Sequence, residues 1–170
     1  MDTERLPPQN LEAEQGLLGS LLIDRDAIIR VGDLVAPDDF YKDSHQRIYE
    51  AIRELFEKRE PIDLLSLTNR LTERKELEVI GGRAYLMTLA NAVPTSSHVV
   101  HYAHIVQKKA TLRRLISAAT SIAQTGYETT EDMDAVLDRA EQTLFGVSQK
   151  YLKQTFVPLK QILGDAFERI

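Results

Sequence analysis

Three histidines have the spacing in this 170-residue chain that most suggests chemistry. His98, His101 and His104 recur at every third position. On an α-helix His98 and His101 could share a metal ion, but His104 is rotated well off that face, at about 100° per residue. No carboxylate lies among them to complete a ligand set. We therefore favour a solvated or interface cluster near a helix start, and keep a helical enzyme that uses these histidines as an alternative.

The other candidates for chemistry are weaker. His45 falls on the apolar face of an expected helix, three residues before Ile48, where a hydrogen-bonded core histidine is commoner than a catalytic one. Gly81-Gly82 is more typical of a turn between helices than of a phosphate loop. The chain contains no nucleotide-binding loop of the form G-x-x-x-x-G-K-[S/T]. We predict no catalytic, metal or cofactor site in this chain.

The overall composition is that of a soluble globular protein. It is 43% hydrophobic and 28% charged. The net charge of −5 argues against strong binding of duplex DNA by this segment alone. No apolar run approaches the roughly 20 residues of a membrane span, and the polar start is not a secretory signal. The absence of cysteine excludes disulfides and permits an intracellular setting.

Apolar residues recur at helical steps along the whole chain, and no segment alternates as a strand would. We predict an all-α fold with a compact helical head of about five to six helices over residues 1–97. A long projecting αα-hairpin follows over residues 98–151. Residues 152–158 read as a linker, and a separate terminal linker helix begins at residues 159–170.

Polar and small residues predict how the helices of the head begin and pack. Asn10 and Asp63 are expected N-caps, and Asp43 resembles the first residue of a capping box. Gly16 and Gly19 lower helix propensity, but they permit the close approach of a neighbouring helix.

The expected hairpin is unusually long. Its first arm, His98 to Thr125, spans 28 residues, or about 42 Å of helix. Gly126 has the freedom to end this arm in a left-handed conformation, and Thr129 with Asp132 fits a capping box for the second arm. The near half of the first arm is expected to face its own head, and the far half to face another chain.

Charge supports the pairing of two hairpins. The first arm carries four basic residues and no acid, whereas the second carries six acids and one arginine. An antiparallel pair of hairpins would bring these charges together. A phosphate-binding use of the basic residues is the alternative, but no aromatic residues interleave with them. The residues expected in hairpin self-association are Lys108, Lys109, Arg113, Arg114, Met133, Val136, Leu137, Ala140 and Leu144.

A further apolar stripe occupies the terminal helix. A short helix with such a face is not expected to end a natural protein, so we expect the chain to be a fragment. The stripe should dock on a missing carboxy-terminal domain or on a neighbouring subunit. Its residues are Leu159, Ile162, Leu163, Ala166, Phe167 and Ile170.

Several stretches, in the same order along the chain, are similar to the opening of bacterial replicative helicases of the DnaB type. The similarity covers essentially the whole chain, which is more specific than any single motif. The stretches are Leu6–Gln15, Leu18–Ser20, Asp39–Tyr41, Ser44–Tyr49, Glu60–Leu64, Ile80–Gly82 with Tyr85 and Leu86, Ala92–Thr95, Tyr102–Val106 and Leu112–Ile116.

The resemblance implies an amino-terminal domain without cofactor, followed by the start of a linker helix. The parent helicase would use ATP and Mg²⁺ and move on single-stranded DNA through a motor domain after Ile170. In the cytoplasm the amino-terminal domains would form dimers, and a trimer of dimers in the hexamer. Further partners would be the primase carboxy-terminal domain and a helicase loader. The resemblance places primase contacts at Tyr85, Tyr102, Ile116 and Ile122.

One function of a different class stays open from the sequence. The chain could be a stand-alone helical adaptor, or the similarly built helicase-binding domain of a primase. A nucleotide-binding loop further along the parent gene would decide for the helicase.

Overall fold

The structure is a computed structural model, and it describes residues 5–128 and 132–168, with side chains through Thr155. The chain divides into two units, which we name the head unit (residues 9–110) and the hairpin unit (residues 1–8 and 111–170). The predicted all-α class is confirmed, since every regular element of the described residues is a helix. The elements are α1 (Leu11–Ile23), α2 (Ala27–Val31), the 3₁₀ helix η1 (Pro37–Asp39), α3 (Asp43–Glu57), α4 (Leu64–Glu73), α5 (Gly82–Ala90), α6 (Val99–Glu128) and α7 (Met133–Glu168).

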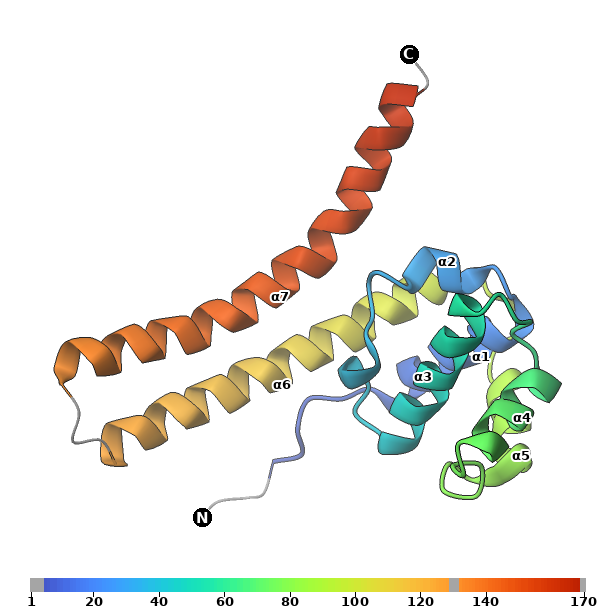
Figure 1. Cartoon of the computed structure of the whole chain (residues 1–170), viewed down its shortest axis with the longest axis horizontal. Helices are drawn as coiled ribbons and strands as arrows, with labels where there is room; N and C mark the ends of the chain where they lie inside the picture. The colour runs from blue at the N-terminus through green and yellow to red at the C-terminus, as the bar shows by residue number, and fades with distance from the viewer. Residues whose placement is uncertain (1–4, 129–131, 169–170) are drawn as a thin grey trace. The chain divides into compact units, whose positions relative to one another are not determined.

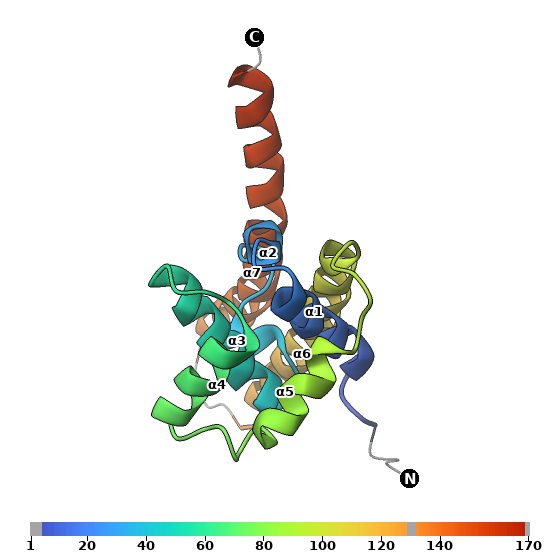
Figure 2. The ribbon, with the colours of Figure 1, turned by 90° about the vertical axis from the view of Figure 1, so that its right-hand side faces the viewer.

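The head unit is organised around α1. This helix contacts α3 and α5, and α4 in turn contacts α3 and α5 (Figure 2). Because α1 meets neighbours on more than one side, it is apolar or small around most of its circumference. The fully buried side chains include Leu17, Leu18, Leu21, Ile48, Ile52, Leu55, Leu67, Leu71, Leu86 and Leu89.

The glycines of α1 allow close helix packing, as the sequence predicts. A Cβ atom at Gly19 would lie 2.3 Å from the carbonyl oxygen of Leu89. At Gly16 it would lie 3.0 Å from the ring of Tyr102. Only a residue without a side chain lets the backbone of the α5 end approach α1 this closely.

Of the three caps predicted in the head, two are confirmed. The Asn10 side chain accepts from the backbone N–H of Ala13 at 2.9 Å, and Asp63 accepts from that of Ser66 at 2.7 Å. Asp43 is not a cap, because it is the first residue of α3 and pairs with Arg47 four residues later instead. Gly81 and Gly82 both have positive φ, which confirms the predicted turn before α5.

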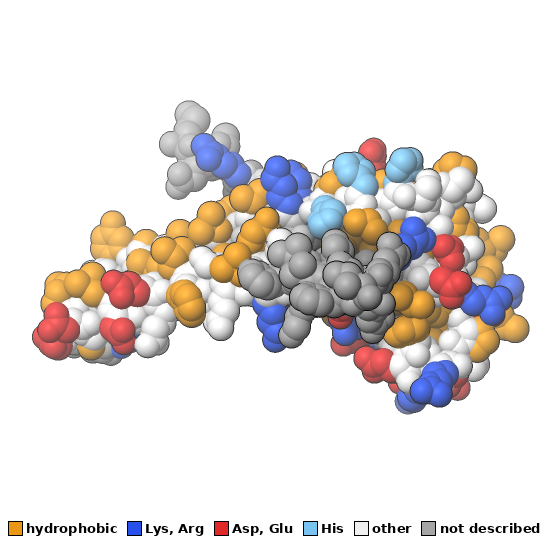
Figure 3. Space-filling model, turned by 90° about the horizontal axis from the view of Figure 1, so that it is seen from above, with side chains coloured by type: hydrophobic (Ala, Val, Ile, Leu, Met, Phe, Trp, Pro, Cys, Tyr) orange, Lys and Arg blue, Asp and Glu red, His pale blue; other side chains and the backbone are white. Residues whose placement is uncertain are grey.

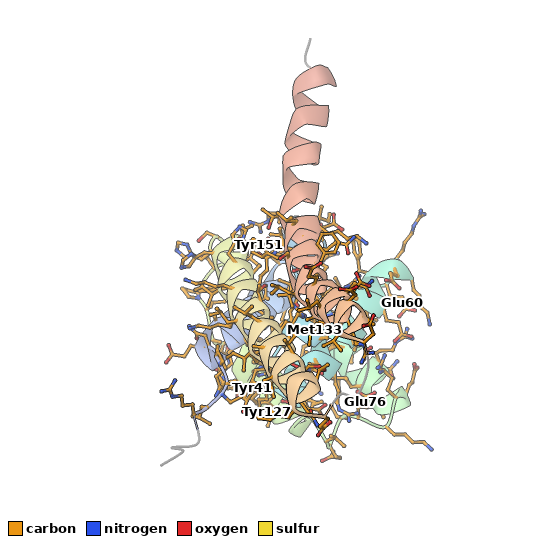
Figure 4. All side chains as sticks on the ribbon, turned by 90° about the vertical axis from the view of Figure 1, so that its left-hand side faces the viewer. Tyr41, Glu60, Glu76, Tyr127, Met133 and Tyr151 are labelled. Atoms are coloured by element: carbon orange, nitrogen blue, oxygen red, sulfur yellow. The ribbon has the colours of Figure 1, made fainter. Side chains whose placement is uncertain are left out.

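Ion pairs hold α4 against α3. Arg70 of α4 and Arg74, which follows α4, bond the α3 residue Glu54 at 3.0 Å and 2.9 Å. Hydrogen bonds from Arg74 and then Lys58 hold the pKa of the Glu54 carboxyl below its usual value. Two further acids labelled in Figure 4 join this group, since Glu60 pairs with Arg70 and Glu76 with Arg74.

A second polar contact holds the start of α6. The Asp24 carboxylate, just after α1, accepts from the Ser96 hydroxyl at 2.8 Å and from Arg30 at 2.9 Å. The bond from Ser96, followed by the backbone bond from Asp26, holds the pKa of Asp24 below its usual value. The contact joins positions more than seventy residues apart along the chain.

The first turns of α6 belong to the head unit. Val99, Ala103 and Val106 are buried in the head core, and Ala110 is buried as well. The head therefore extends past residue 97, where the sequence suggests a boundary. The near half of this helix does face its own head, as expected.

Two expected breaks in the long helices are absent. Gly126 is helical and α6 continues to Glu128, so the predicted left-handed end at Gly126 is wrong. A single helical glycine costs only about 1 kcal/mol, which a long helix tolerates. The proposed cap residue Thr129 lies outside the described residues.

The predicted linker over residues 152–158 and the separate helix after it are also wrong as secondary structure. Helix α7 runs without interruption from Met133 to Glu168. No residue between 153 and 157 breaks a helix, and Pro158 removes one backbone donor and favours a bend. Figure 1 shows that α7 bends along its course.

Candidate functional site

Helix α7 carries two stripes of different exposure. Every third or fourth side chain is half-buried or buried, and this inner stripe consists of Val136, Ala140, Thr143, Val147, Lys150 and Gln154. A second, apolar stripe is exposed. This outer stripe consists of Met133, Leu137, Leu144 and Tyr151, and Figure 4 labels its first and last members.

The far half of α6 repeats this division. Ala118 is buried and Ile122 is half-buried, whereas Leu115 and Ile116 are exposed. Alternating steps of three and four are the spacing of helices packed along a seam. Figure 3 shows hydrophobic side chains along the exposed surface of the hairpin unit. The α7 residues that the sequence predicts for self-association therefore fall on two surfaces, one turned inward and one exposed.

The basic residues expected in self-association differ in their surroundings. Lys108 is exposed, and Lys109 and Arg114 are half-buried. Within the hairpin unit, Arg113 donates to the carbonyl oxygen of Pro8 at 2.8 Å. Arg113 therefore ties the N-terminal arm to α6, a contact that the sequence does not reveal.

A buried polar chain ends at Tyr85. Glu14 and His45 are both buried, and Oε1 of Glu14 lies 2.7 Å from Nδ1 of His45. Nε2 of the same imidazole lies 2.5 Å from the hydroxyl oxygen of Tyr85. Glu14 also accepts from the backbone N–H groups of Tyr41 at 2.8 Å and Lys42 at 3.3 Å. The expectation of a hydrogen-bonded core histidine at position 45 is confirmed.

Tyr85 borders a surface groove of about 490 Å³ in the head unit. Its ring stacks on His45, with centroids 5.9 Å apart and planes inclined by 7°. The ammonium of Lys42 lies 4.8 Å from the same ring centroid, within range of a cation–π contact. The groove is further lined by Ser44, Val79, Ile80, Gly81, Ala84 and Thr88.

Tyr102 borders a different groove of about 380 Å³. Its half-buried ring covers Gly16, and the groove also includes Glu12 and Ile105. Tyr85 and Tyr102 thus lie on separate surfaces of the head unit, while Ile116 and Ile122 belong to the hairpin unit.

The histidine cluster is exposed. His98, His101 and His104 are all exposed, and Figure 3 shows histidine side chains close to one another on the surface. Among the side chains described, those of residues 5–128 and 132–155, no group of three metal-ligating side chains has the geometry to hold an ion. Over the same residues, no helix combines the length and apolar character needed to cross a membrane.

Glu14 is the site residue that sequence reasoning missed. With Glu12 it looks like a first-turn acid that favours the helix dipole. The missed signal is its register, because it precedes Leu17 and Leu18 by three and four residues and so lies on the buried face. For the terminal stripe, the side chains of Leu159, Ile162, Leu163, Ala166 and Phe167, and the whole of Ile170, lie outside the described residues.

Comparison with known proteins gives consistent results. Residues 6–108 match the family model of the DnaB-like helicase N terminal domain. Over 168 residues the chain is 42% identical to the replicative DNA helicase DnaB of Geobacillus stearothermophilus. It is 41% identical over 167 residues to the replicative DNA helicase DnaC of Bacillus subtilis. These alignments cover 99% and 98% of this chain but only 37% of either relative.

Solved structures agree with the sequence comparison. The crystal structure of the N-terminal domain of DnaB helicase from Mycobacterium tuberculosis matches with a TM-score of 0.80 and 42% identity, over 83% of this chain and 99% of that one. A structure of a DnaB-like replicative helicase and its interactions with primase matches with a TM-score of 0.68, over 89% of this chain and 35% of that one. At 24% identity this second likeness concerns the fold alone.

The fold and its surfaces define an all-helical domain with a long hairpin whose outer face is apolar and open. The chain belongs to the family of DnaB-like helicase N-terminal domains. The comparisons favour this assignment over the helicase-binding domain of a primase, which the sequence leaves open.

Proposed function

We propose that this chain is the assembly and primase-docking domain of a bacterial replicative DNA helicase. The observation that carries the proposal is the outer stripe of the hairpin unit. Leu137 is 54% exposed and Leu144 is 48% exposed, at positions two turns apart on α7. Apolar side chains aligned in this way are typical of a surface that another protein covers.

A second copy of the chain is the partner that best fits this stripe. Three members of the stripe, Leu137, Leu144 and Tyr151, recur at seven-residue steps, the repeat by which helices pair along their length. A twofold pair would place the stripe of one copy on that of the other. Three such dimers would form the collar of a hexamer, and the basic cluster of α6 would lie near acids of the partner's α7.

Primase docking is the second part of the proposal. A protein of the same fold is described with its primase interactions, and this supports a docking role for the present fold. Tyr85 and Tyr102 would supply head contacts, while Ile116 and Ile122 would supply hairpin contacts. Aromatic and large apolar side chains of this kind commonly dominate protein–protein binding.

The remaining roles concern the longer parent protein. We propose that it unwinds duplex DNA with ATP and Mg²⁺, and that its motor domain moves on single-stranded DNA in the cytoplasm. Residues 159–170, the segment that begins within the last turns of α7, would dock on the motor domain of the adjacent subunit. A helicase loader would be a further partner of the assembly.

Two measurements test the domain's function. Light scattering over a concentration series should show dimers or larger assemblies, and titration with a primase carboxy-terminal domain should show saturable binding. The proposal predicts that Ile116→Ser weakens the second interaction without changing the helical circular dichroism. A strict monomer at high concentration would contradict the assembly role, and an absence of primase binding would contradict the docking role.

A further inference from the structure

With an ionised carboxylate and a neutral imidazole, the buried chain of Glu14, His45 and Tyr85 has a single hydrogen-bond direction. An ionised carboxylate only accepts, and Glu14 already receives backbone N–H groups from Tyr41 and Lys42. Nδ1 of His45, 2.7 Å from the carboxylate, therefore donates. In a neutral imidazole the other nitrogen then accepts, so Tyr85 donates its hydroxyl hydrogen to Nε2.

This chain fixes the position of the Tyr85 ring. The hydroxyl is anchored on a fully buried histidine, which is itself held by a buried carboxylate from α1. One ring face stacks on His45, and the ammonium of Lys42 approaches the ring at 4.8 Å. Without this anchor, a half-buried tyrosine such as Tyr85 would lose rotational freedom about two side-chain bonds when a partner bound it.

We propose that Glu14 and His45 are positioning residues for Tyr85, which they hold in the orientation that the docking partner contacts. The inference rests on the proposed function, because it takes Tyr85 as a primase contact. A side chain held in its bound orientation before the encounter raises affinity by lowering the entropy lost on binding. Glu14 and His45 thus act on primase binding without touching primase.

Binding of the primase carboxy-terminal domain to three single variants and one double variant tests this inference. Tyr85→Phe keeps the ring but removes its anchor, and should weaken binding about three- to tenfold, the cost of ordering one side chain on binding. Glu14→Gln should weaken binding by a similar factor, because an amide has one acceptor oxygen where the carboxylate uses two, so either Nδ1 of His45 or the backbone N–H of Tyr41 faces an NH2 group. Tyr85→Ala should weaken binding further, since the ring is lost as well.

The double variant Glu14→Gln with Tyr85→Phe distinguishes positioning from a general structural effect. If both substitutions break the same hydrogen-bond chain, the affinity of the double variant for primase equals that of whichever single variant binds primase less tightly. A loss of affinity in the double variant equal to the product of the two single-variant losses would overturn the inference. Glu57→Gln makes the same chemical change at an exposed position of α3 and should leave binding unchanged.

Nitrogen-15 NMR of the imidazole tests the mechanism independently of primase. The inference predicts that Nδ1 of His45 carries the hydrogen and that Nε2 does not. A protonated Nε2 in the native protein would overturn it, whatever the binding results. If Tyr85→Ala weakens binding while Tyr85→Phe and Glu14→Gln do not, positioning fails and the docking role stands. If Tyr85→Ala binds as tightly as the native protein, Tyr85 is no primase contact, and both fail.

Discussion

The substitution Leu144→Ser offers a quantitative test of the outer stripe. About half of this side chain is still exposed, at 48%. Complete burial of a leucine contributes about 1.5–3 kcal/mol, so the exposed half is worth about 1 kcal/mol to an interface. A twofold dimer contains the residue twice, which gives about 2 kcal/mol and an increase of roughly 30-fold in the dimer dissociation constant.

Sedimentation equilibrium at several loading concentrations measures this constant. Leu65→Ser is the matched control, because Leu65 is an even more exposed leucine, at 72%, on α4 of the head unit. The control should leave the dissociation constant unchanged, and both variants should keep native helical circular dichroism. A change of less than twofold for Leu144→Ser, or an equal change for both variants, would refute the reasoning.

Three further predictions concern the head and the N-terminal arm. Gly19→Ala should destabilise the head by about 1–3 kcal/mol, seen as a lower thermal midpoint, because its Cβ would overlap the α5 backbone. Since the folded-state pKa of Glu54 is lowered, its ion pair stabilises the protein above the unfolded-state pKa, near 4.3, and the contribution is lost as pH falls through the folded-state value. Glu54→Gln should therefore reduce the fall in the free energy of unfolding as pH is lowered. An unchanged pH dependence in this variant would exclude the Glu54 ion pair as a source of the acid sensitivity. Arg113→Ala should speed tryptic cleavage at Arg5 without altering the thermal midpoint, because the contact of Arg113 with Pro8 restrains the arm.

Local chemistry explains which parts of the fold the sequence predicts. Asn10 and Asp63 cap their helices through hydrogen bonds to the third following residue. Because a cap depends only on residues close along the chain, it can be predicted from the sequence. Gly81 and Gly82 supply the positive φ angles that their turn needs. The helical period likewise identifies the long hairpin, because it depends on spacing along one helix alone.

Features that depend on residues far apart along the chain are not predicted from local sequence patterns. The stop expected at Gly126 and the linker at 152–158 fail because helix continuation reflects the whole helix, not one weak residue. Glu14 looks like a surface acid until the N–H groups of Tyr41 and Lys42 are brought to it. The apolar seam of α7 likewise divides into inner and outer stripes only once burial is known.

A thiol accessibility measurement tests most directly whether a second copy covers the outer stripe. The chain has no cysteine, and Ser148 is exposed between Leu144 and Tyr151, so Ser148→Cys adds one thiol to the stripe with little change in shape. Thr72→Cys on the exposed side of α4 is the control. The account predicts that the rate of labelling at position 148 falls as protein concentration rises through the dimer dissociation constant, while that at position 72 stays constant. Equal, concentration-independent rates at both positions would contradict it.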